Sequence, residues 1–154
     1  TADEVWQGVP GHAEDSVHLA LFPAVDGSVE ERPGWAAMLE TRTVVMKALE
    51  DARAAKRIAS SLEARVTLSA PAAVLAPLRA YDAGPRVFPG NLANLFIVSD
   101  VTLTETDSPL AVEVERARGA KCERCWTYSE NVGKLSVHPG VCERCADVLK
   151  TLAP

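Results

Sequence analysis

Two C-x-x-C pairs near the end of the chain constrain its folding more than any other feature. Cys122 and Cys125 form the first pair, and Cys142 and Cys145 form the second. Two residues between cysteines let one tight turn aim both sulfurs at a point about 2.3 Å away, and a second such turn completes a tetrahedron. The spacing predicts a structural zinc ion held by four thiolates, with no open position for a catalytic water.

Paired cysteines also occur in disulfides, redox motifs and iron sites. Disulfides need an oxidising compartment, and no charged-then-apolar leader indicates one. A thioredoxin-type motif uses one C-x-x-C after a strand, not two pairs in a short tail. Iron also binds four thiolates, and the spacing does not exclude it. His138 lies between the pairs, but with four cysteines present it is interpreted as a surface histidine that precedes Pro139.

The cysteine-containing tail, residues 118–154, is poor in large apolar side chains. Such a segment cannot build a hydrophobic core of its own and needs a metal or a disulfide to hold it. Gly133 and Pro139-Gly140 lie between the pairs and favour the chain reversals of a short hairpin. We therefore expect residues 118–154 to form a four-cysteine zinc finger or ribbon.

Residues 35–117 predict an α+β unit in which a long helix packs on a small sheet. Apolar residues recur at helical spacing within residues 35–60, and Pro33 suits a helix start. The predicted buried face of this helix consists of Trp35, Met38, Leu39, Val45, Met46, Leu49 and Ala52.

The rest of this unit predicts the order strand, helix, strand, strand. Residues 64–68 alternate as a half-buried strand does, and residues 71–81 predict a short helix that Pro77 would break or kink. The run Leu95-Phe96-Ile97-Val98, continuing to Leu103, predicts a strand, and residues 111–115 predict another. Nothing in this unit resembles a catalytic constellation, so we interpret it as a scaffold.

Residues 1–34 predict a helical turn or two followed by an irregular connector rich in Pro and Gly. The chain opens without Met and with apolar residues already in place, which is how a piece of a longer polypeptide begins. No apolar run reaches the eighteen or so residues that a membrane span needs. We therefore expect a cytoplasmic protein without a membrane partner.

The charge distribution predicts weak non-specific binding to nucleic acid. The net charge is −5, with 10 Lys/Arg against 17 Asp/Glu in residues 1–116 and 6 against 4 in residues 117–154. A phosphate backbone would find few uncompensated cations on such a chain. Any contact with nucleic acid is expected at a few placed residues, with help from a larger body.

Cations and aromatic rings gather around the cysteines. The residues concerned are Lys121, Arg124, Trp126, Tyr128, Lys134 and Arg144. This composition is typical of surfaces that stack unpaired bases and pair with phosphates. It is equally typical of a small finger core, in which Trp126 packs over the zinc turn and the arginines neutralise thiolate charge. Composition leaves both interpretations open.

Several stretches together resemble one family. The opening Thr1-Ala2-Asp3-Glu4-Val5-Trp6 resembles the end of the anticodon-binding domain of class I synthetases for isoleucine, valine and leucine. The stretches 47–53, 60–64 and 95–99 resemble the junction region of bacterial isoleucyl-tRNA synthetases, and 121–126 with 142–145 resembles their C-terminal zinc finger. Residues 82–94 depart from the family pattern, so a loop variant is expected there.

The resemblance implies the C-terminal part of a monomeric enzyme that joins isoleucine to tRNA with ATP and Mg²⁺. Because the family's ATP-handling and editing parts lie upstream, this chain is expected to hold no catalytic residue and to be inactive alone. The family's zinc-bearing tail is thought to hold the anticodon end of tRNA, which would make Lys121, Arg124, Trp126 and Arg144 RNA-binding residues. The finger also resembles that of formamidopyrimidine-type DNA glycosylases, whose catalytic N-terminal Pro this chain lacks. A free-standing zinc ribbon that binds protein is the alternative function.

Overall fold

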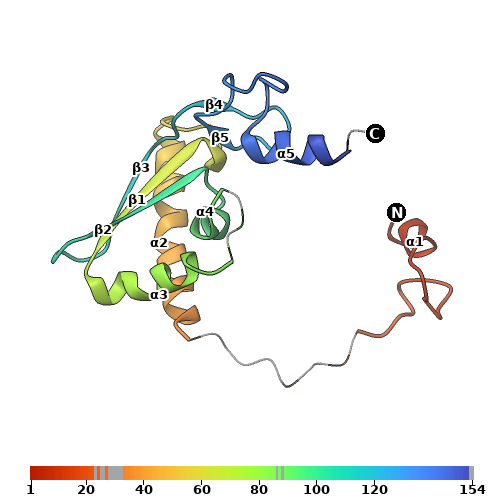
Figure 1. The fold of residues 1–154 in the computed structure, drawn as a ribbon. Helices are drawn as coiled ribbons and strands as arrows, with labels where there is room; N and C mark the ends of the chain where they lie inside the picture. The colour runs from red at the N-terminus through yellow and green to blue at the C-terminus, as the bar shows by residue number, and fades with distance from the viewer. Residues whose placement is uncertain (23, 25–26, 28–32, 86, 88, 153–154) are drawn as a thin grey trace. The chain divides into compact units, whose positions relative to one another are not determined.

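The computed structural model describes residues 1–152 except 23, 25–26, 28–32, 86 and 88. The chain divides into two compact units, Thr1–Glu31 and Arg32–Pro154. The elements are α1 (Ala2–Trp6), α2 (Trp35–Ala54), a 3₁₀ turn η1 (Ser61–Glu63), β1 (Ala64–Ala70), α3 (Ala72–Asp82), α4 (Asn91–Phe96), β2 (Asp100–Glu105), β3 (Ala111–Arg116), β4 (Ala120–Lys121), β5 (Tyr128–Ser129) and α5 (Glu143–Leu152), as Figure 1 shows.

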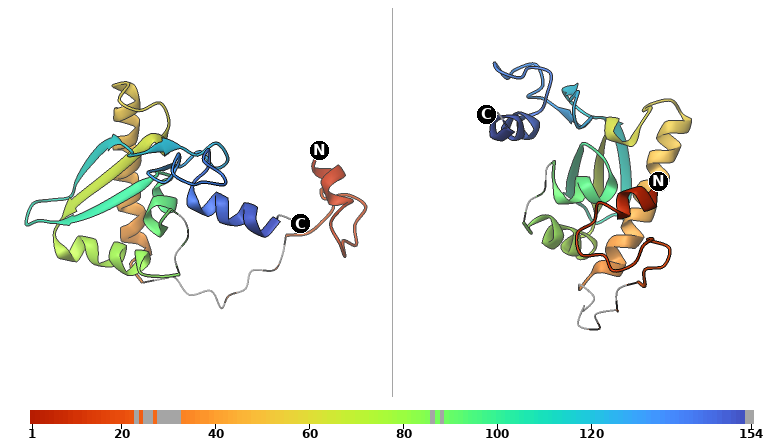
Figure 2. Two further views of the ribbon diagram at one scale, coloured as in Figure 1. Left: turned by 45° about the horizontal axis from the view of Figure 1, so that its top comes forward. Right: turned by 90° about the vertical axis from the view of Figure 1, so that its right-hand side faces the viewer.

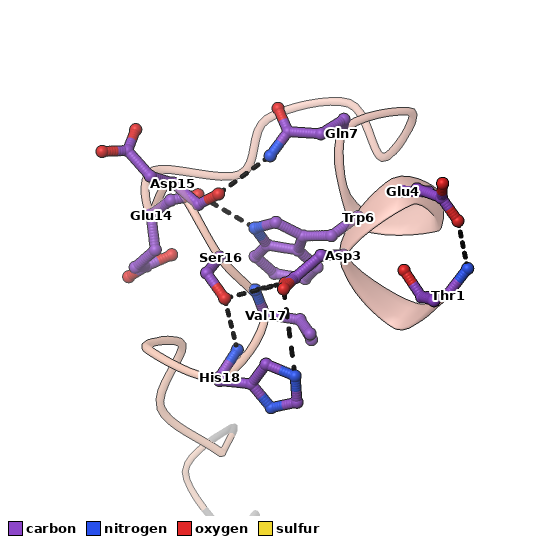
Figure 3. A network of polar contacts seen from close by, with 10 residues as sticks. All are labelled: Thr1, Asp3, Glu4, Trp6, Gln7, Glu14, Asp15, Ser16, Val17 and His18. Carbon is purple, nitrogen blue, oxygen red and sulfur yellow. Dashed lines mark hydrogen bonds and ion pairs between the residues drawn. The ribbon is translucent and has the colours of Figure 1, made fainter.

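The first unit is held mainly by hydrogen bonds between α1 and the loop after it (Figure 3). The Asp3 carboxylate accepts the Ser16 hydroxyl at 2.7 Å and the Val17 N–H at 3.1 Å. The indole of Trp6 donates to the Glu14 carbonyl at 2.9 Å. The hydrogen bond from Ser16 is the main reason why the pKa of Asp3 is lowered. The expected helical turn is therefore confirmed, while part of the expected connector lies outside the described residues.

The second unit is built on a three-stranded sheet in the order β2-β1-β3. Strands β1 and β2 run parallel, with Val66 beside Val101, and β1 and β3 run antiparallel, with Val66 beside Val114. Paired residues share a face of the sheet, so the valines and leucines of the three strands form one apolar face. Figure 2 shows α2 crossing this sheet. The α+β prediction is confirmed.

Helix α2 begins at Trp35 as predicted and ends at Ala54, because Lys56 adopts a left-handed φ of 57° that stops the helix. Its buried positions are Met38, Thr41, Val45, Leu49 and Ala52. The predicted Leu39 is 43% exposed, whereas Thr41 is buried and donates its hydroxyl to the Ala37 carbonyl at 2.9 Å. The buried face of α2 packs with β1, α3 and α4 in one continuous core.

The connection from β1 to β2 contains two helices, where the sequence pattern predicts one. Helix α3 runs through Pro77 without ending there. The strand predicted from Leu95 to Leu103 is confirmed in its second half, where β2 begins at Asp100, but its first half is wrong. Helix α4 covers Asn91–Phe96, and Ile97 ends it with a left-handed φ of 58°. Leu92, Ala93 and Phe96 are buried at helical spacing, so these apolar side chains reach the core from a helix and not from a strand.

Asn91 holds the segment between α3 and α4, part of the expected variant loop at 82–94. Its side-chain amide donates to the Tyr81 carbonyl at 3.1 Å, and its side-chain oxygen accepts the Val87 N–H at 2.9 Å. The Asp82 carboxylate accepts the Leu92 N–H at 3.1 Å. The bond from Leu92 satisfies an N–H in the first turn of α4, and the bonds of Asn91 link this helix start to the end of α3 and to the segment before α4.

Candidate metal centre

The first cysteine pair lies at the tip of the β4–β5 hairpin. The Cys122 N–H donates to the Thr127 carbonyl at 3.0 Å, and the Trp126 N–H donates to the Cys122 carbonyl at 2.9 Å. At the entry to this hairpin Gly119 has a φ of +83°, and a Cβ there would lie 2.2 Å from the Ser129 carbonyl oxygen. Only glycine therefore lets the chain enter β4 so close to β5.

The second pair lies at the start of α5. Cys142 precedes the helix and its carbonyl accepts the Ala146 N–H at 2.9 Å, while Cys145 lies in the first turn. Helix α5 was not predicted, although the apolar pair Ala146 and Leu149 lies at helical spacing. The chain reversal between the pairs is confirmed at Gly133, whose N–H donates to the Pro139 carbonyl at 2.7 Å. The hairpin itself, however, encloses the first pair and does not lie between the two.

The four sulfur atoms converge on one point. All lie within 4.8 Å of one another, and the Cys125 and Cys142 sulfurs are 3.6 Å apart. Four bonds of about 2.3 Å in a tetrahedron require sulfurs about 3.8 Å apart, so the arrangement fits a single four-coordinate ion. Cys122, Cys142 and Cys145 are fully buried, and His138 is not among the clustered ligands.

The pKa values of the clustered thiols indicate that a cation is needed for all four to be deprotonated. Burial raises the pKa of the thiols of Cys142 and Cys145. At Cys122 burial acts in the same direction, but backbone N–H groups, that of Cys125 first, outweigh it and lower the pKa to about 6. Backbone hydrogen bonds therefore stabilise the Cys122 thiolate, while burial disfavours the thiolates of Cys142 and Cys145. A divalent ion among the sulfurs supplies the charge that lets all four deprotonate.

The predicted RNA-binding residues separate into distinct environments. The Arg124 guanidinium lies 3.7 Å from the Cys145 sulfur, so it contributes to neutralising thiolate charge. Trp126 is 60% exposed and lies outside the finger core, which consists of the cysteines with Val132 and Val141 packed against them. The Lys121 ammonium lies 5.0 Å from the centre of the Trp126 ring. Arg144 is exposed and lines a groove with Ile97 and Thr127.

Trp126 adopts a left-handed backbone conformation, with a φ of 67°. A non-glycine residue there costs roughly 1–2 kcal/mol. Gly or Asn would adopt the same turn at a lower energetic cost, so the turn alone does not require a tryptophan.

The finger is joined to the sheet through Ser99, a residue that no sequence motif marks. Its hydroxyl donates to the Leu62 carbonyl at 2.5 Å and accepts the Tyr128 N–H at 2.8 Å. The hydroxyl is buried, and both of its contacts connect separate segments. The zinc-binding hairpin is therefore anchored to the start of β1 and the start of β2.

Comparison with known proteins identifies both parts of the second unit. Residues 119–148 match the family described as the zinc finger found in FPG and IleRS. Over 97% of its length the chain is 43% identical to the isoleucine–tRNA ligase of Geobacter sulfurreducens, 44% to that of Syntrophotalea carbinolica and 42% to that of Bacillus mycoides. The chain spans 17% of the length of each of these relatives.

These matches confirm the resemblance drawn from the motifs. Together with the converging sulfurs they establish residues 122–145 as a structural zinc site. No helix in the part of the chain that the structure describes is long and apolar enough to cross a membrane.

Proposed function

We propose, from the premise that this chain is homologous over nearly its whole length to isoleucine–tRNA ligases, that its zinc finger holds the anticodon end of tRNA in such an enzyme. The whole ligase would use ATP and Mg²⁺ to join isoleucine to that tRNA, as a cytoplasmic monomer. The homology favours this function over a free-standing protein-binding ribbon, because it extends through the α+β unit as well as the finger.

The observation that carries the proposal is the exposed indole of Trp126 beside the Lys121 ammonium. Stacking of a base on an aromatic ring is worth about 1–3 kcal/mol, and a neighbouring cation can pair with the phosphate that follows. The zinc-fixed turn holds this ring in a defined position, so little conformational entropy is lost on binding. Arg124 and Arg144, which are both exposed residues of the finger, would add positive charge near the first cysteine pair and at the start of α5.

Trp126→Ala in the whole ligase is expected to weaken tRNA use roughly ten- to a hundredfold, since about 1.4 kcal/mol is a factor of ten. Amino-acid activation should be unchanged, because the adenylate site lies elsewhere in the enzyme. Steady-state aminoacylation at varied tRNA concentration, together with zinc content, measures both effects. Val137→Ala is the matched control, because Val137 is an apolar residue of the finger that is even more exposed, at 71% against 60% for Trp126.

Trp126→Gly separates contact from packing. Glycine removes the indole and also relieves the left-handed strain, so this variant should be more stable than Trp126→Ala by about 1 kcal/mol. If Trp126 contacts RNA, both variants lose the same tRNA affinity despite their different stabilities. A tRNA defect that follows zinc loss or thermal stability from one variant to the other would contradict the contact.

Isoleucine activation by this chain alone is expected to be absent. No nucleotide-binding motif was found in the sequence, and the chain spans only 17% of its relatives. Isoleucine-dependent pyrophosphate exchange should stay at background with the purified chain. Turnover above background would show that these residues hold a catalytic site.

A further inference from the structure

A second positively charged site lies away from the zinc finger, at the C-terminal end of α2. An open cavity of about 400 Å³ is lined by the cations Arg53, Lys56, Arg57 and Arg116 and by one carboxylate, that of Glu63. Residues 1–116 contain 10 Lys/Arg against 17 Asp/Glu, so four of the ten cations of an acidic region meet at one cavity. Such a concentration differs from the mixed charge of an ordinary solvated surface.

Within the described residues, two of these four cations have protein partners for their side chains, and two do not. Arg57 donates to the Val114 carbonyl at 3.1 Å, and Arg116 lies 3.8 Å from the Glu63 carboxylate. Glu63 is further occupied by the Ala59 N–H at 2.9 Å. The side chains of Arg53 and Lys56 make neither a hydrogen bond nor an ion pair with any residue that the structure describes, although the Lys56 backbone N–H donates to the Arg53 carbonyl at 2.9 Å.

The helix end does not account for this charge. The C-terminus of an α-helix carries the equivalent of about half a negative charge, which cations near it complement. Four cations against one carboxylate leave about three positive charges at the cavity. The helix end therefore offsets only a small part of the excess, and an anionic ligand would offset the rest.

One strand that lines the cavity leads directly into the zinc finger. Arg116 ends β3, and β4 of the finger begins at Ala120. In Figure 1 the C-terminal end of α2 and the end of β3 that leads to β4 lie at the same end of the sheet. An extended strand bound at the finger could thus continue to the cavity.

We propose that this cavity binds a backbone phosphate of the RNA whose bases contact the finger. The inference rests on the proposed tRNA function, and it assigns Arg53 and Lys56 as the phosphate ligands, with Arg57 and Arg116 supplying further charge. The contact is electrostatic and independent of sequence, unlike the stacking on Trp126. Each such contact contributes about 0.7–0.9 to the slope of log affinity against log salt concentration.

The test compares two double variants of the whole ligase, with a tRNA transcript as the probe. Arg53→Gln with Lys56→Asn removes two charges at the cavity, and Asn tolerates the left-handed φ of Lys56. Lys47→Gln with Arg79→Gln removes two charges elsewhere, where the cations pair only with Asp51 and Glu105 on the surface. Both double variants should fold, because exposed ion pairs contribute little.

We expect the cavity variant to lose about tenfold in tRNA affinity near 0.15 M salt, with a salt slope lower by between about 1 and 2. The control variant should retain the slope of the parent enzyme, and Trp126→Ala should lose affinity without losing slope. Equal slopes in the two double variants would overturn the phosphate site. An unchanged Trp126→Ala beside an altered cavity variant would overturn the stacking contact instead.

A titration with inorganic phosphate distinguishes a free anion from an RNA phosphate. If the cavity serves RNA, millimolar phosphate should compete no better than chloride at equal ionic strength. Saturable phosphate binding that disappears in the cavity variant, with the tRNA slope unchanged, would show a small-anion site and refute the RNA assignment.

Discussion

Removal of zinc is expected to unfold residues 118–150 and to leave the α+β unit folded. The finger has almost no apolar core apart from its ligands, because Val132 and Val141 are the only other apolar residues of the finger, up to residue 152, that pack against the cysteines. Structural zinc contributes on the order of 10–16 kcal/mol in finger-sized peptides, which is as large as the whole stability of a typical domain. Without the ion, burial of the four thiols contributes far less to the free energy of folding of the finger than zinc binding does.

Persistence of the α+β unit follows from its separate core. The buried residues of that core all lie between Met38 and Val114, and none comes from the finger. Unfolding of the finger would remove the bond from the Tyr128 N–H to Ser99, but a single hydrogen bond contributes only about 1 kcal/mol. The sheet and α2 should therefore remain protected.

Hydrogen exchange of the purified chain, with and without a chelator, measures both parts at once. Elemental analysis should find one zinc per chain before chelation, and returning zinc should restore protection in the tail. Iron in place of zinc would contradict the metal assignment. Unchanged protection of residues 118–150 after the metal has left would contradict the structural role.

The zinc site and α2 could be predicted from sequence because each rests on a local pattern. Two C-x-x-C pairs specify four sulfurs regardless of the loops between them, and the apolar residues of α2 recur at helical spacing. The exposure of Trp126 could not be predicted, because composition does not show whether the ring packs on the finger core or lies in solvent. The basic cavity was also missed, since its cations lie at residues 53–57 and 116 and meet only through the packing of β3 beside the end of α2.

The error at Leu95–Val98 has a different cause. A short run of apolar residues fits a buried strand and a buried helix equally well, so periodicity alone does not decide between them. In the structure the Asp82 carboxylate accepts the Leu92 N–H in the first turn of α4, and the Asn91 amide donates to the Tyr81 carbonyl in the last turn of α3. The Arg42 guanidinium of α2 then donates to the Leu95 carbonyl at 3.0 Å, at the end of the helix. These contacts reach across the fold and leave no local signal.

Phe96→Ala is expected to destabilise the α+β unit by about 3–5 kcal/mol. Phe96 is fully buried and is the largest of the fully buried side chains. Its removal leaves a cavity between α4, α2 and the sheet, and the cost combines lost apolar burial with the cavity itself. Ile97→Ala is the matched control, because Ile97 follows directly in the chain but is 53% exposed and should cost less than about 1 kcal/mol.

Urea unfolding of the zinc-loaded chain measures the difference between these neighbours. The midpoint should fall sharply for Phe96→Ala with an unchanged slope, and hardly at all for Ile97→Ala. Zinc content should be the same in both variants, since the finger core contains no residue of α4. Similar losses for the two variants would mean that Phe96 does not anchor the core and that α4 is not the helix described here. Loss of zinc from Phe96→Ala would instead show that the finger depends on the α+β core, through the same Ser99 link that joins them.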